Sequence, residues 1–155
     1  MSGWSRRRFG RLLAPGLLAA CGKAPRPESP EEAPERVGWV LLNRLDLETG
    51  RMPEKLRALD GRRIRIAGYV VPLEDDLSLA SELLFAPYSG ACIHSPPPPP
   101  NQILQVVMQT EPARFQMDRC YWLEGRLRIS DSQSPYGRVA YRLEGTALAP
   151  YAGPD

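Results

Sequence analysis

One stretch limits what this chain can fold into more than any other: Gly90 to Gln102, which reads Gly-Ala-Cys-Ile-His-Ser, then five prolines, then Asn-Gln. Each proline fixes φ near −65° and removes a backbone donor, so we expect Pro96 to Pro100 to form a stiff polyproline II segment about 15 Å long. Cys92 and His94, the only histidine, stand just before it. A thiol and an imidazole beside a stiff segment lose little entropy when they are fixed, which is typical of a preorganised site.

The first twenty residues indicate an export signal. A basic head precedes the apolar run Leu12 to Ala20, which is too short to cross a hydrocarbon core of about 30 Å. The run ends in Leu-Ala-Ala-Cys, which resembles a bacterial lipobox and predicts that Cys21 is the lipidated first residue of the mature protein. Ser5 to Phe9 resembles the twin-arginine export motif, with an ordinary basic head as the alternative.

Residues 21–36 predict a disordered tether, because they are rich in proline and glutamate and poor in apolar side chains. Removing the four arginines of the signal from the twenty Lys and Arg leaves sixteen, against eighteen Asp and Glu. The mature chain therefore carries a net charge near −2, and with no basic stripe left we expect no nucleic-acid partner.

Residues 37–152 are expected to form one mainly β domain. Two short helices are predicted first, over Val37–Leu47 and Pro53–Leu59. Period-two alternation and the breaks between segments then predict five bent antiparallel strands, and glycines inside them indicate bulges. This pattern favours a small OB-like β-barrel over a short sandwich, with Tyr88, Tyr121 and Trp122 in its core. The strands are expected over Arg62–Val71, Glu82–Tyr88, Gln102–Gln109, Cys120–Ser130 and Arg138–Ala149.

Three stretches of the sequence carry a resemblance to a known family. They are Leu59 to Glu74; Leu83 to His94 with its proline run and Asn101-Gln102; and Ser134 to Gly137. Together these residues resemble a bacterial envelope family of small exported proteins and lipoproteins whose domain has no known function. Members are often encoded beside ABC transporter components, and some in zinc-responsive gene groups, which implies a role near envelope transport or metal handling. Cys120, before Tyr121-Trp122, departs from the pattern expected of that family.

Metal binding is the first interpretation of the Cys-x-His pair. On an extended segment, Cys92 and His94 point to one face, so sulfur and imidazole can converge on one ion. Thiolate with imidazole suits zinc best. Two ligands are too few for a tight tetrahedral site, so Cys120, Asp118, Glu74, water or a second copy would have to complete it.

Three alternatives stay open from the residues alone. Cys92 and His94 could be structural, with Pro96, Pro97, Pro98, Pro99, Pro100, Asn101 and Gln102 docking on an aromatic groove of a partner. A disulfide between Cys92 and Cys120 would suit an oxidising compartment. A thiol-dependent Cys/His enzyme is the third, although no orienting carboxylate stands nearby in sequence.

The sequence therefore predicts a lipoprotein anchored by Cys21 in the bacterial cell envelope and facing the periplasm, with the outer membrane preferred because Gly22 is not aspartate. We expect it to act without catalysis, binding zinc or docking an ABC transporter component or another envelope protein. A thiol-dependent enzyme and a purely structural interaction module are the alternatives.

Overall fold

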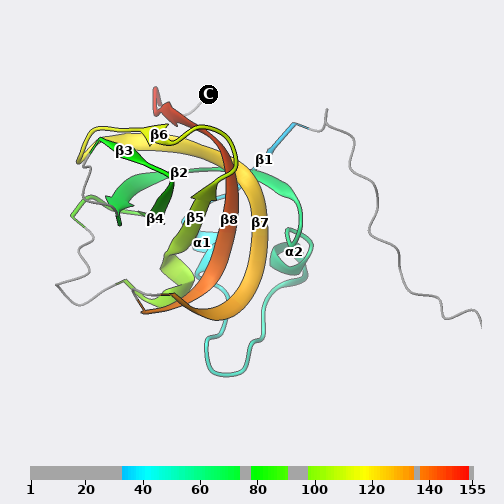
Figure 1. The fold of residues 1–155 in the computed structure, drawn as a ribbon. Helices are drawn as coiled ribbons and strands as arrows, with labels where there is room; N and C mark the ends of the chain where they lie inside the picture. Colours follow the sequence, from blue (N-terminus) through cyan, green and yellow to red (C-terminus); the bar gives the residue numbers. More distant parts are fainter. Residues whose placement is uncertain (1–32, 74–77, 91–97, 135–136, 154–155) are drawn as a thin grey trace, which may run out of the picture. The chain divides into compact units, whose positions relative to one another are not determined.

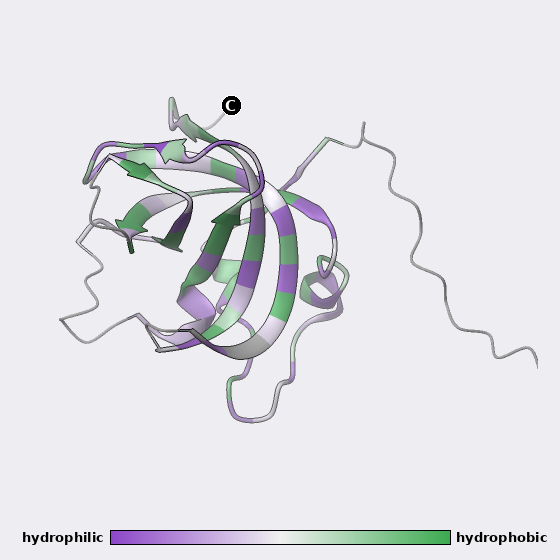
Figure 2. Ribbon diagram, viewed as in Figure 1, coloured by the Kyte–Doolittle hydropathy of each residue, from purple (hydrophilic) through white to green (hydrophobic). Residues whose placement is uncertain are grey.

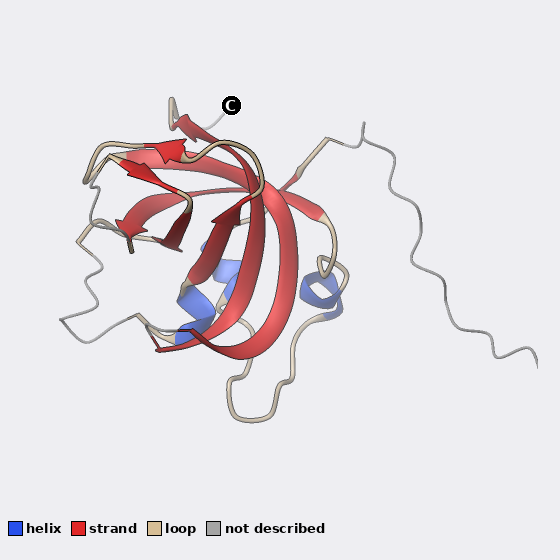
Figure 3. Cartoon of the chain, viewed as in Figure 1, coloured by secondary structure: helices blue, strands red, loops and turns tan. Residues whose placement is uncertain are grey.

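The computed structural model describes residues 33–73, 78–90, 98–134 and 137–153. Contacts divide the chain into Met1–Pro30 and Glu31–Asp155, and every described residue belongs to the second unit. This unit is mainly β, with a few short helices (Figure 3). Its elements are β1 Glu35–Arg36, α1 Trp39–Leu42, α2 Glu54–Arg57, β2 Arg63–Pro72, β3 Leu79–Ala80, β4 Glu82–Ala86, η1 Pro100–Gln102, β5 Leu104–Met108, β6 Ala113–Arg114, β7 Cys120–Ser134 and β8 Gly137–Pro150.

Five strands form a ring. They pair in the order β2-β4-β5-β8-β7, and β7 pairs back onto β2 from Arg63↔Arg126 to Tyr69↔Cys120. The long strands β7 and β8 curve across one side of the ring in Figure 1. The first strand, β1, adds to β2 in parallel, and β3 and β6 make a separate two-stranded sheet.

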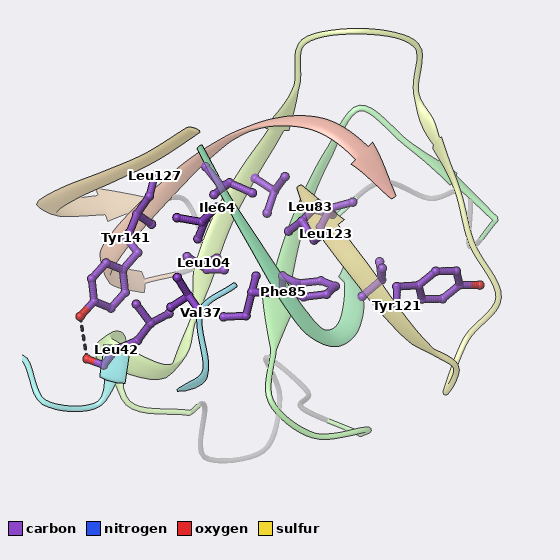
Figure 4. Packing of buried hydrophobic residues seen from close by; sticks show 14 of the residues in the cluster. Val37, Leu42, Ile64, Leu83, Phe85, Leu104, Tyr121, Leu123, Leu127 and Tyr141 are labelled. Carbon is purple, nitrogen blue, oxygen red and sulfur yellow. Dashed lines mark hydrogen bonds between the residues drawn. The ribbon is translucent and has the colours of Figure 1, made fainter. Parts of the chain in front are cut away.

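Alternation along the strands explains the core. In β2, every second residue from Ile64 to Val70 is buried, as period-two side-chain geometry requires. The same alternation appears along β7 in Figure 2 as bands of hydrophobic and hydrophilic residues. The inward side chains meet in one cluster whose fully buried members include Phe85, Leu104 and Tyr141 (Figure 4).

The sequence predicted all five ring strands within a few residues of their observed bounds, and it predicted both short helices, although α1 ends at Leu42 and not at Leu47. One expectation about pairing was wrong, because β5 and β8 run parallel, from Leu104↔Tyr141 to Met108↔Gly145. The predicted tether also ends earlier than expected. Glu35 and Arg36 pair with Ile64 and Arg65, so the sheet begins inside the segment assigned to the tether.

A bulge bends β7 where the sequence placed a glycine. The β7–β8 register shifts between Glu124 and Gly125, and Gly125 lies opposite Gly145. A Cβ atom on Gly125 would lie 2.3 Å from the carbonyl oxygen of Glu144, a distance at which the backbone must move. Glycine is therefore required at this crossing of two backbones.

Three side-chain contacts fix the short N-terminal helix against the ring. The Tyr141 hydroxyl donates to the Leu42 carbonyl at 2.6 Å, the dashed contact in Figure 4. The Trp39 indole nitrogen donates to the Ala67 carbonyl at 2.6 Å, and the ring of Trp39 stacks on Phe85 with centroids 6.3 Å apart. These contacts hold the residues around Trp39 against β2 and against the core.

Candidate functional site

The loop that carries Cys92 and His94 starts from a defined position. Residues 91–97 lie outside the described part of the chain, but Ser89 and Gly90 are described just before them. The Ser89 hydroxyl donates to the Asp118 carboxylate at 2.5 Å, and both side chains are exposed. Gly90 has φ +75°, in the left-handed region that favours glycine. The carboxylate of Asp118 therefore lies beside the residues that immediately precede the segment containing Cys92 and His94.

Asp118 itself has an uncommon backbone conformation. It is the only non-glycine residue with positive φ, +61°, among those described. Asp is one of the few residue types enriched in this region of φ/ψ space. The turn that contains Asp118 directs the chain from the Phe115 region into β7, so the carboxylate lies two residues before Cys120.

The far end of the loop is fastened inside the fold. Pro98 is buried, Pro99 is exposed with φ −55° and ψ 149°, as in polyproline II, and Pro100 already begins the 3-10 turn η1. Asn101 is 7% exposed, and its amide nitrogen donates to the carbonyls of Asn43 and Leu45 at 3.2 and 3.0 Å. The stiff segment predicted for the whole run thus extends only to Pro99 in the described part.

The described residues of the predicted partner-docking set, Pro98 to Gln102, mostly make contacts within their own chain. Besides the buried Asn101, Gln102 donates from its side-chain amide to the Asn43 side chain at 3.2 Å. Pro99 is the one exposed member among the described residues of this set. Asn101 and Gln102 therefore position the loop, a role that their sequence position beside the prolines did not reveal.

Cys120 lies at the start of β7, opposite Tyr69 of β2, and it is a free thiol. Burial raises the pKa of the Cys120 thiol, while hydrogen bonds from the backbone of Tyr121 and Gly68 act in the opposite direction. The thiol is therefore mainly protonated near neutral pH, and a metal would have to displace its proton.

Several predicted site residues fall outside the described residues: Cys21, Glu74, Cys92, His94, Pro96 and Pro97. Within the ranges that are described, no group of three or more His, Cys, Asp or Glu side chains could hold a metal ion. The structure therefore brings together only the framework of the predicted site, Asp118 and Ser89 at one end of the loop and Asn101 at the other.

Sequence reasoning placed three aromatic residues in the core: Tyr121 lies in the main core cluster, Trp122 is buried outside that cluster, and Tyr88 is exposed. Tyr88 is 45% exposed. Trp122 is 7% exposed but follows Tyr121, and adjacent strand residues face opposite sides, so it packs on the outer surface. There the guanidinium groups of Arg36 and Arg65 lie 4.8 and 4.5 Å from its ring centroid. Period-two alternation alone could have shown that neighbours in β7 cannot share the core.

A ring of five strands defines a small β domain, and its sequence identifies the family. Residues 47–150 match the family described as "Protein of unknown function (DUF3299)". The chain belongs to this family, which confirms that the resemblance was to an uncharacterised domain.

Comparison of structures agrees with this assignment. The chain is similar to the crystal structure of a DUF3299 family protein from Pseudomonas aeruginosa PAO1, with 29% sequence identity and a TM-score of 0.60. The match covers 80% of this chain and 100% of that one. No curated protein matches the sequence. Among the described residues, none of the helices has the length and hydrophobicity needed to cross a membrane.

Proposed function

We propose that this protein is a zinc-binding accessory lipoprotein of the bacterial envelope, anchored through Cys21 and facing the periplasm. The ligands are Cys92 and His94, and Asp118 completes the site. The observation that supports this proposal is the hydrogen bond between Ser89 and Asp118. It places a carboxylate at the root of a segment that carries a thiol and an imidazole.

Chain geometry limits how far the ligands can be from that carboxylate. Consecutive Cα atoms are 3.8 Å apart, so the Cα of Cys92 lies within about 7.6 Å of the Cα of Gly90. Gly90 adjoins Ser89, whose hydroxyl contacts Asp118. Thiolate, imidazole and carboxylate are all common zinc ligands, and a water molecule can occupy the fourth position.

The strand order favours Asp118 over Glu74 as the third ligand. Pro72 pairs with Leu83 near the start of β4, so β2 ends there, two residues before Glu74 in the sequence. Ser89 follows the opposite end of β4, after Ala86. The length of β4, about 13 Å at 3.3 Å per residue, separates the two positions. Cys120 remains the alternative third ligand, because it follows Asp118 by two residues.

The described half of the proline run favours this metal proposal over partner docking. Pro98 and Asn101 are buried, so they cannot contact a partner without partial unfolding. Their burial instead fixes the far end of the loop, which lowers the entropy lost when Cys92 and His94 bind an ion. We further infer that the ring is a five-stranded Greek-key barrel of the OB type, because five strands close on themselves and the β7–β8 pairing is bulged.

Zinc binding is tested on the full chain with Cys21→Ser, which prevents lipidation. The protein is purified from a reducing cytoplasm, dialysed against zinc, and its metal content is measured by elemental analysis. We expect about one equivalent, lost in Cys92→Ser and His94→Gln. Asp118→Asn should weaken zinc binding by about 10- to 100-fold, whereas Glu111→Gln, which alters an exposed carboxylate, should leave it unchanged.

The results distinguish between the possible sets of zinc ligands. Zinc below about a tenth of an equivalent in the parent protein would refute metal binding. If Cys120→Ser weakens zinc binding and Asp118→Asn does not, the third ligand has been assigned incorrectly. The anchor is tested separately by membrane fractionation, in which the natural chain should sediment with membranes and the Cys21→Ser chain should not.

A further inference from the structure

Arginines face one another on the outer surface of the ring. Arg63 of β2 lies opposite Arg126 of β7, and Arg128 of β7 lies opposite Arg142 of β8. Leu127, between two of these arginines, is buried in the core, so its neighbours along the strand point outward. Figure 2 shows hydrophilic bands along β7 and β8. We call this surface the arginine face, and its members are Arg63, Arg65, Glu124, Arg126, Arg128, Arg142 and Glu144.

The arginine face carries an excess of positive charge. Glu124 lies 3.6 Å from Arg65. Glu144 lies 3.5 Å from Arg126 and 3.6 Å from Arg128, so two guanidinium groups share this carboxylate. Five arginines less two glutamates leave a net charge of +3 on the face, and this value is the same whichever ion pairs form.

The two facing pairs of arginines favour an anionic partner. Like charges directly opposite each other destabilise a sheet, and an anion that bridges two arginines replaces this repulsion by attraction. The planar guanidinium fork suits the oxygens of a phosphate. Arg128 and Arg142 are both exposed, so this pair can meet a partner without a change of the fold. Just before β2, Asp60 and Arg62 add one charge of each sign and leave the excess unchanged.

The N-terminal end of the domain lies beside the arginine face. β1 runs parallel to β2, with Glu35 opposite Ile64 and Arg36 opposite Arg65. The described chain begins at residue 33, twelve residues after Cys21, and twelve residues span at most about 43 Å when fully extended. A lipid on Cys21 therefore keeps the arginine face close to the bilayer that holds the lipid.

We propose that the arginine face docks on the surface of a bilayer that contains anionic phospholipids. Its guanidinium groups donate hydrogen bonds to headgroup phosphates, and the attraction acts within about one Debye length, roughly 10 Å at about 0.1 M salt. This inference rests on the lipid anchor of the proposed function, because the anchor supplies the proximity. The mature chain has a net charge near −2, so the bilayer attracts this face and not the whole domain. Docking therefore sets the orientation of the domain on the membrane.

The experiment measures binding to vesicles without the lipid anchor. The chain is used from position 21 onward, with Cys21→Ser, because the basic export signal would bind anionic vesicles by itself. Met1–Pro30 is a separate unit, so removal of residues 1–20 leaves the described domain whole. Co-sedimentation compares vesicles of phosphatidylcholine alone with vesicles that also contain phosphatidylglycerol.

We expect binding only to vesicles that contain phosphatidylglycerol. This binding should be lost as the salt concentration is raised from about 0.1 M to about 1 M, where the Debye length falls to about 3 Å. Each arginine at a membrane surface contributes roughly fivefold in affinity, so Arg128→Gln with Arg142→Gln should weaken binding about 25-fold. Arg128→Lys with Arg142→Lys keeps the charge and should retain most of the binding.

A matched control removes the same charge elsewhere. Arg114 and Arg119 are exposed, and Arg119 directly precedes β7 at the end of that strand far from Arg128. Arg114→Gln with Arg119→Gln should leave binding to phosphatidylglycerol vesicles nearly unchanged. The melting temperature and the zinc content of both glutamine double variants should equal those of the parent, because these arginines are exposed and none of them is a proposed zinc ligand.

Other results would overturn the proposal. Equal binding to both kinds of vesicle, or unchanged binding in Arg128→Gln with Arg142→Gln, would show that the arginine face does not recognise anionic lipid. Equal weakening in the control would mean that net charge acts without a specific face. Tighter binding to a DNA duplex than to phosphatidylglycerol vesicles at equal phosphate concentration would assign the face to nucleic acid.

The anchor and the face fail in different ways. If the natural chain does not sediment with membranes but the unlipidated chain binds phosphatidylglycerol vesicles, the anchor is refuted and the face is supported. If the natural chain sediments with membranes and the unlipidated chain binds neither kind of vesicle, the face is refuted and the anchor is supported.

Discussion

The hydrogen bond from Tyr141 to Leu42 makes a quantitative prediction about stability. Tyr141 is fully buried, and its hydroxyl makes one of the contacts that join the core to the short helix α1. Tyr141→Phe removes this donor and keeps the ring. The Leu42 carbonyl also accepts from the Leu45 amide at 3.2 Å, so it retains one partner in the variant. We therefore expect a loss near the low end of the range for a buried hydrogen bond, about 1 kcal/mol.

The same variant has a distinct dependence on pH. Burial raises the pKa of the Tyr141 hydroxyl well above its usual value near 10, so the folded protein keeps this proton when the unfolded chain loses it. The stability contributed by the neutral hydroxyl is complete below pH 10 and is lost as the pH rises above it. The free energy of unfolding of the parent should fall about 1.4 kcal/mol per pH unit more steeply than that of Tyr141→Phe.

Urea unfolding of the full chain with Cys21→Ser, with and without Tyr141→Phe, measures both effects. At pH 7 the parent should be more stable by about 1 kcal/mol, and this advantage should disappear by roughly pH 11. The other tyrosines, the lysine residues and the cysteines titrate in both proteins, so their contributions cancel in the comparison. Parallel pH profiles would refute the reasoning, because they would mean that Tyr141 ionises as easily in the folded state as in the unfolded chain.

Further predictions follow from the backbone crossing, the loop anchor and the thiol. Gly125→Ala should destabilise the fold by about 2 kcal/mol or more, whereas Gly38→Ala should be neutral or stabilising, and equal melting temperatures would contradict the bulge geometry. Asn101→Ala should lower the free energy of unfolding by about 2 kcal/mol and Gln102→Ala by much less, since only Asn101 is buried. Similar urea midpoints for the two variants would argue against an anchoring role of the Asn101 side chain. With the other cysteines replaced by serine, Cys120 should react with a thiol probe at a higher half-labelling pH when folded than when denatured, and a lower value would contradict the effect of burial.

Much of the fold could be predicted from the sequence, because apolar segments of strand length are separated by turn residues and β2 alternates strictly. Ile64, Ile66 and Val70 are buried on one side of β2, and this pattern was visible without any structure. The parallel pairing of β5 with β8 was not visible, because alternation reports the face of a strand and not its neighbour. The two-residue strand β1 was missed for a related reason. Two backbone pairings leave no periodic pattern in a segment rich in proline and glutamate.

The candidate site was predicted less completely than the fold. The residue types of the loop identified it, but the contact of Ser89 with Asp118 joins positions 29 residues apart in sequence. Asn101 was interpreted as part of a docking surface, whereas its side chain is used within the domain. Trp122 was predicted to lie in the core, whereas it is buried outside the main core cluster. The alternation of Tyr121 and Trp122 along β7 could have corrected this.

Closure of the ring restricts how another protein can bind to this one. Each of the five ring strands has a hydrogen-bonded neighbour on either side, since β7 pairs back onto β2. Along the stretches paired on both sides, a partner therefore cannot add its own strand, which is a common mode of peptide recognition and also a common cause of aggregation. Recognition there has to proceed through side chains and loops, so substitutions of surface residues should abolish it while the backbone stays unchanged.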